Sequence, residues 1–143
     1  MRFIFFALAT SLLIQAQAPP LVGLRSKAET RLTLIAKQLQ SVDSISAQGL
    51  RFKRLDEVIS SLENEVNRLN LELETNICPE QKQTLTISIK MWSKYYLTER
   101  KHFDTLNSCL GTNHLEASHY ALAQMLSFRC GYLASQLIDF ERR

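Results

Sequence analysis

The stretch "LRFKRLDEVISSLENEVNRLNLELET", residues 50–75, decides the fold of this chain. Large apolar side chains recur along it at alternating steps of three and four residues: Phe52, Leu55, Ile59, Leu62, Val66, Leu69 and Leu73. This spacing places the seven side chains, which we call the seam, on one face of an α-helix at the a and d positions of a heptad pattern. Charged residues lie outside the seam, among them Glu57, Glu63, Glu65, Arg68 and Glu72. We therefore expect a long amphipathic helix whose seam packs against other helices.

Three other segments show the same helical spacing. The first runs from about residue 24 to about residue 48, and its apolar stripe consists of Ala28, Leu32, Ile35, Leu39 and Val42. Gly49 follows it, and glycine is common directly after the end of a helix. The next helix is expected to begin at Pro79, because proline is favoured in the first turn and Glu80 complements the positive end of the helix dipole. Its stripe consists of Leu85, Ile89, Trp92, Tyr96, Phe103, Leu106 and Leu110.

The last segment spans about residues 115–140, after a break at "GTNH", residues 111–114. Its inward stripe consists of Leu122, Leu126, Cys130, Leu133, Leu137 and Phe140. Four helices of about 25 residues joined by short turns predict an all-α fold, an antiparallel up-down bundle. A long coiled-coil hairpin that dimerises is the alternative architecture, because the seam suits either one.

The N-terminal sequence has the layout of a secretory signal peptide. Arg2 precedes an apolar run from Phe3 to Ile14, and small residues follow it. Cleavage is expected after Ala16, or after Ala18, although Pro19 fits badly directly after a cut. Residues 1–16 are then the signal peptide, and 17–143 form a single helical bundle domain. No other apolar run is long enough to span a bilayer, so we expect a secreted, extracellular protein without a transmembrane segment.

Three cysteines enter an oxidising compartment, where thiols tend to pair. Cys78 and Cys109 lie at opposite ends of one expected helix, about 45 Å apart, which excludes a bridge between them. If residues 107–114 form an extended loop, the last helix can shift towards Cys78. We therefore expect a disulfide between Cys78 and Cys130, with Cys109–Cys130 as the alternative. Cys109 is then the odd thiol, which either links two chains or stays free and buried.

Catalytic and metal-binding motifs are scarce. Glu116 and His119 have the Glu-x-x-His spacing of di-iron bundles, but such sites need two of these motifs and the chain has one. A solvated helix start is the better interpretation. We expect no catalytic residue, no metal and no cofactor, and a secreted hydrolase is a minor alternative. With a net charge of +3 and no block of five like charges, nucleic-acid binding is not expected either.

A basic stretch, "RFKR" from Arg51 to Arg54, has the spacing that furin-type proteases cut in secreted precursors. Such a protease reads an extended segment, whereas Phe52 fits the seam of a helix. Processing at this stretch therefore stays open.

Two functions are compatible with these features. The first is an extracellular helical protein that binds another protein, with a disulfide-linked homodimer as one form. The alternative is a carrier of a small apolar or lipid ligand between the helices. Aromatic and methionine side chains suit such a cavity because they adapt to irregular shapes, and the candidates are Met91, Trp92, Tyr95, Tyr96, Phe103 and Met125.

Overall fold

The computed structural model describes residues 23–141, without the side chains of residues 112–113 and 138–141. The expected signal peptide, residues 1–16, and the side chain of Phe140 lie outside this part. Four helices follow one another: α1 (Leu24–Val42), α2 (Gln48–Asn76), α3 (Pro79–Leu110) and α4 (Thr112–Glu141). No strand occurs between residues 23 and 141. The all-α bundle of four helices is therefore confirmed.

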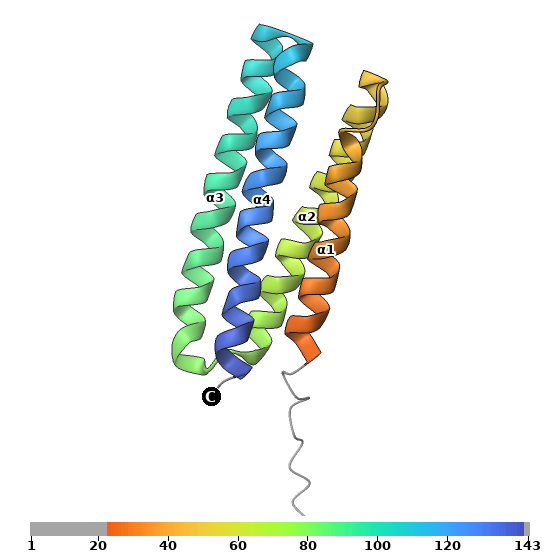
Figure 1. Cartoon of the computed structure of the whole chain (residues 1–143). Coiled ribbons are helices and arrows are strands. Elements are labelled where there is room, and N and C mark those ends of the chain that lie inside the picture. Colours follow the sequence, from red (N-terminus) through yellow and green to blue (C-terminus); the bar gives the residue numbers. More distant parts are fainter. Residues whose placement is uncertain (1–22, 142–143) are drawn as a thin grey trace, which may run out of the picture.

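Consecutive helices run antiparallel, and α2 and α4 share the largest interface (Figure 1). α1 packs against both members of this pair. α3 packs mainly against α4 and only lightly against α2. The core consequently lies between α2 and α4, and α1 and α3 cover it from the two sides.

The core is built from the stripes of α2 and α4. Its largest fully buried side chains come from these two helices and the end of α1: Val42, Leu55, Val58, Leu62, Leu69, Leu73, Leu126, Cys130, Leu133 and Leu137. In α3, Tyr96 is the one buried side chain. The other stripe residues of α3 are partly buried, except Leu110, which is exposed at the end of the helix.

The boundary between the first two helices differs from the sequence prediction. α1 ends at Val42, and Gly49 lies in the first turn of α2. The reason is local, because the Ser44 hydroxyl donates to the backbone oxygen of Ser41 at 2.7 Å. Serine side chains that bond nearby backbone groups offer the chain an alternative to helix. The helix expected over 24–48 therefore stops six residues early.

The connection between α3 and α4 is a single residue, Gly111. Its φ of +80° lies in the left-handed region that favours glycine. The Ser118 hydroxyl donates to Asn107 Oδ1 at 3.1 Å and ties the two helices together beside the turn. The expectation of an extended loop over 107–114 is therefore wrong, and α4 has no slack with which to shift along the bundle.

One charged side chain of α2 lies inside the fold. Glu65 was expected outside the seam, but it is only 4% exposed. Arg31 of α1 donates through Nε to Glu65 Oε1 at 2.8 Å and through Nη2 to Glu72 Oε2 at 3.1 Å. Burial by itself would lower the pKa of Arg31, but the two carboxylates raise it above the ordinary arginine value. Glu65 is buried because α1 packs against the side of α2 that lies next to the seam.

Candidate functional site

The seam is part of the core rather than a binding surface. Six of its seven side chains are buried: Leu55, Ile59, Leu62, Val66, Leu69 and Leu73. The seventh, Phe52, is half-buried, and its ring centroid lies 6.1 Å from that of His119. Because α4 covers this face of α2 within one chain, the seam serves the bundle and does not present a free coiled-coil surface.

All three cysteines are unpaired in the structure. Cys78 is the residue just before α3 and Cys109 lies in its last turn, and both are exposed. Cys130 is fully buried, and its thiol donates to the backbone oxygen of Leu62 at 3.7 Å. Burial raises the pKa of Cys130 to about 12.

The expected bridge between Cys78 and Cys130 has no support in this arrangement. Cys130 lies level with Leu62, and the helix continues from there to Asn76 before the chain reaches Cys78. Fourteen helical residues at a rise of 1.5 Å cover about 21 Å, far beyond the reach of a disulfide. Cys109 lies next to the α3–α4 turn, at the opposite end of α3 from Cys78.

Two residues at the start of α4 are bound to α2 rather than solvated. Nη2 of Arg51 donates to Glu116 Oε2 at 3.3 Å, and His119 Nε2 lies 2.9 Å from Asp56 Oδ1. The same Arg51 lies in the helical first turns of α2, so its basic stretch is not extended. Among the described side chains, no group of three or more His, Cys, Asp or Glu could hold a metal ion.

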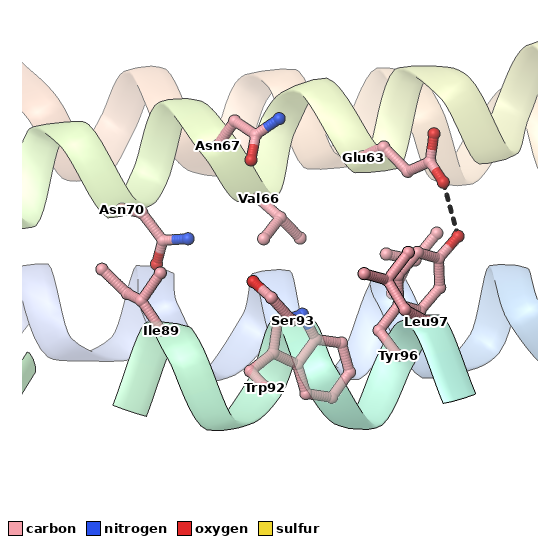
Figure 2. Close-up of a pocket in the computed structure, with 10 residues that line it drawn as sticks. Glu63, Val66, Asn67, Asn70, Ile89, Trp92, Ser93, Tyr96 and Leu97 are labelled. Atoms are coloured by element: carbon pink, nitrogen blue, oxygen red, sulfur yellow. Dashed lines mark hydrogen bonds between the residues drawn. The ribbon is translucent and has the colours of Figure 1, made fainter. Parts of the chain in front are cut away.

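A groove of about 260 Å³ lies between α2 and α3 (Figure 2). We call it the α2–α3 groove, and its lining includes Val66, Asn67, Asn70, Ile89, Trp92, Tyr96 and Leu126. At one end the Tyr96 hydroxyl donates to Glu63 Oε1 at 2.6 Å, and Arg100 Nη1 donates to the same oxygen at 2.6 Å. Desolvation raises the pKa of Tyr96 above its ordinary value, and Glu63 raises it further. This network ties α3 to α2.

Asn70 is the buried polar side chain of the groove. It is only 8% exposed, and its Oδ1 is buried without a hydrogen-bond partner among the described residues. Figure 2 shows the amide directed from α2 towards Ile89 of α3. A buried polar group without a partner costs about 1–3 kcal/mol. A molecule in the groove that carries an N–H or O–H group would supply the missing bond.

A second candidate site lies on the outer side of α3 and α4. Met91 and Tyr95 stand one turn apart on α3, and Phe128 and Tyr132 stand one turn apart on α4; all four are exposed. Arg129 joins the two pairs, because its Cζ lies 5.2 Å from the Trp92 ring and 5.5 Å from the Tyr132 ring. Trp92 in turn contacts Tyr95, with a centroid distance of 5.9 Å. We call Met91, Tyr95, Phe128, Arg129 and Tyr132 the aromatic face.

Sequence reasoning pointed to part of these sites. It selected Met91, Trp92 and Tyr95, but as candidates to line a cavity between helices. It missed Phe128, Arg129 and Tyr132, which lie off the inward stripe of α4. The available signal was the presence of two large aromatic residues one turn apart on the side of the helix that was expected to be polar.

Comparisons of the chain with protein families, curated proteins and solved structures return no match. None of the described helices has a stretch apolar enough to cross a bilayer.

Proposed function

We propose that this protein is secreted and acts outside the cell by binding another protein through the aromatic face. One observation carries the proposal: four large apolar side chains of the packed helices α3 and α4 are more than half exposed, and one of them, Tyr132, lies against Arg129. The exposed fractions reach 69% for Met91 and 81% for Phe128. Folded proteins seldom leave such a cluster uncovered unless it is used for binding.

The composition of the aromatic face supports a protein partner. Tyrosine, phenylalanine, methionine and arginine are enriched at the centres of protein–protein interfaces, and tyrosine and arginine often dominate the binding energy. The secretory part of the proposal is supported by the sequence of residues 1–16. The proposal includes a disulfide-linked homodimer as one form of the protein, and the exposed thiols of Cys78 and Cys109 support it.

The test compares partner binding by two double variants. The first, Met91→Ser with Phe128→Ser, removes apolar groups from the aromatic face without touching the core. The control, Leu34→Ser with Leu71→Ser, removes two exposed leucines elsewhere on the bundle.

A partner is identified by cross-linking to wild-type protein in extracellular fluid, is purified, and is titrated against each variant by calorimetry. We expect the face variant to lose about tenfold or more in affinity, because interface hot spots contribute about 2 kcal/mol or more each. The control should bind as the wild type does. Equal affinities for all three proteins would refute the aromatic face as the binding surface.

A second candidate function is a carrier for a small apolar molecule held in the α2–α3 groove. The unpartnered Asn70 oxygen favours it, because a mainly apolar ligand that carries one N–H or O–H group would donate the missing hydrogen bond. The groove of about 260 Å³ lies just below the usual range of ligand pockets, so the ligand would be small.

Native mass spectrometry of secreted protein tests this function before and after solvent extraction. A bound mass should be present at first, and it should be absent from Asn70→Leu but present in Asn64→Leu, which alters the exposed side of α2. Wild-type protein that carries no extra mass would argue against the carrier.

A further inference from the structure

Arg129 is partly buried and forms no ion pair with any carboxylate among the described side chains. Its Nη2 makes one long hydrogen bond, 3.4 Å to Ser88 Oγ, and its Nε is buried without a partner among the described residues. The three other partly buried arginines of this part of the chain, Arg25, Arg31 and Arg51, each lie within 4 Å of a carboxylate. Arg129 therefore differs from these three arginines, because no described carboxylate neutralises its charge.

The partial burial of Arg129 disfavours its charged form. Desolvation lowers the pKa of Arg129 below the ordinary arginine value, although the guanidinium stays charged at neutral pH. The rings of Trp92 and Tyr132 stabilise the cation partly, because the faces of aromatic rings carry negative potential. They also hold the guanidinium in a fixed orientation, while its hydrogen-bond donors remain largely unused.

No carboxylate of the neighbouring sequence is in a position to fill the gap. α4 contains no acidic residue between Glu116 and Asp139, and α3 contains none between Glu80 and Glu99. The exposed charges of that stretch of α3 are lysines, including Lys90 and Lys94. These stretches of α3 and α4, residues 81–98 and 117–138, therefore combine cationic and apolar side chains and contain no carboxylate that could pair with Arg129.

We propose that Arg129 recognises a carboxylate of the protein partner, an Asp or Glu side chain set among apolar residues. This inference rests on the proposed function and names the chemistry of the partner. A guanidinium fork fits a carboxylate with two parallel hydrogen bonds, and such charge-assisted bonds are stronger where surrounding apolar groups exclude water. The rings of Trp92 and Tyr132, 5.2 Å and 5.5 Å from the guanidinium carbon, supply apolar surface beside it.

The charge pattern disfavours a second copy of this chain as the occupant. A symmetric pair would bring the same surface of both protomers together. The Arg129 guanidinium of one copy would then meet the same surface, where residues 81–98 and 117–138 offer it no carboxylate, and like charges across an interface are repulsive. A partner with carboxylates on an apolar segment is complementary to this surface.

Trp92 provides a direct readout, because it is the sole tryptophan of the chain and lies against Arg129. The probes are 4-phenylbutyrate, which combines a carboxylate with an aromatic group, and its neutral amide. Both are titrated into the full secreted protein while tryptophan fluorescence is recorded. We expect the carboxylate to bind saturably. The affinity of the amide should be lower by about tenfold or more, because the amide cannot accept a charge-assisted hydrogen bond from Arg129.

Variants separate the paired hydrogen bonds of the guanidinium from the effect of its positive charge. Arg129→Gln should weaken carboxylate binding about tenfold, and Arg129→Lys should give an intermediate loss because it keeps the charge without the fork. Lys90→Gln removes one positive charge from an exposed position of α3 and should leave binding within about twofold of the wild type. Circular dichroism confirms that each variant folds. Equal losses in Arg129→Gln and Lys90→Gln, or equal binding of acid and amide, would overturn the inference.

The purified partner separates this inference from the proposed function. If the partner binds Arg129→Gln as it binds the wild type but loses affinity for the Met91→Ser, Phe128→Ser variant, the carboxylate inference fails and the proposed function stands. If 4-phenylbutyrate binds through Arg129 while no protein depends on the aromatic face, the proposed function fails. Arg129-dependent binding to phosphatidylserine vesicles, without a protein partner, would assign the anion to lipid and overturn the inference.

Discussion

The cysteine side chains of this bundle lie in two different environments. Cys78 and Cys109 are exposed, whereas Cys130 is buried in the core and bonded to a backbone oxygen of α2. A buried thiol avoids ionisation because the thiolate loses its hydration, and burial accordingly raises the pKa of Cys130 from an ordinary value near 9 to about 12. This difference makes the stability of the fold depend on pH in the alkaline range.

Cys130 should therefore make the protein less stable as the pH rises from about 9 towards about 12. The folded-state pKa lies above the unfolded one, so the stabilisation is complete below pH 9 and is lost as the unfolded thiol ionises first. Urea unfolding at pH 7.5, 9 and 10.5 with a reducing agent measures the slope. Cys130→Ala should show a shallower decline than the wild type, while Cys109→Ala, at an exposed position, should follow the wild type. Parallel declines in all three proteins would contradict this account.

At the scale of the helices, α1 is attached by its apolar stripe and by the ion pairs that Arg31 forms with α2. α1 buries only Ala28 and Val42 completely. Arg31 reaches Glu65 and Glu72 of α2, and these three side chains are no more than 20% exposed. Burying one charge without its partner is much more costly than burying the pair.

Arg31→Met should thus lower the free energy of unfolding by about 3 kcal/mol, because it leaves Glu65 buried and unpaired. The double variant Arg31→Met, Glu65→Met should regain most of this loss, because an apolar pair of similar size replaces the ion pair. Arg25→Met removes an ion pair with Glu29 whose two side chains are 39% and 56% exposed, and it should change stability by less than about 0.5 kcal/mol. Urea denaturation measures all three. A double variant as unstable as Arg31→Met would show that the arginine acts through packing and not through its charge.

The helices themselves were predictable because apolar spacing is a local signal. That spacing located the seam and the buried stripe of α4, and the start signals Pro79 and Glu80 located the start of α3. The burial of Glu65 was not predictable, because it depends on which side of α2 is covered by α1. Arg129 was missed for the same reason, since its contact with Trp92 requires the register of α4 against α3. The spacing within one helix shows which face of the helix is apolar. It does not show which neighbouring helix covers the residues on either side of that face.

At the scale of the whole molecule, the exposed thiols determine how two chains can be joined. Cys78 and Cys109 lie at the two ends of α3, whose 32 residues span about 48 Å. They cannot reach each other within one chain, and Cys130 is enclosed in the core. In an oxidising compartment each exposed thiol is therefore available to a second molecule. The sequence alone singled out Cys109, because Cys78 was expected to pair internally.

Protein secreted by eukaryotic cells should run partly as a dimer on a non-reducing gel, and reduction should remove the dimer. Cys109→Ser and Cys78→Ser should each retain some dimer, because the other thiol remains exposed. The double variant Cys78→Ser, Cys109→Ser should be monomeric, and Cys130→Ser should dimerise as the wild type does, because its thiol is buried. A monomeric wild type would rule out the covalent dimer. If Cys109→Ser removes all of the dimer, Cys78 does not form the intermolecular disulfide. If Cys130→Ser removes the dimer, the core opens far enough to expose the Cys130 thiol.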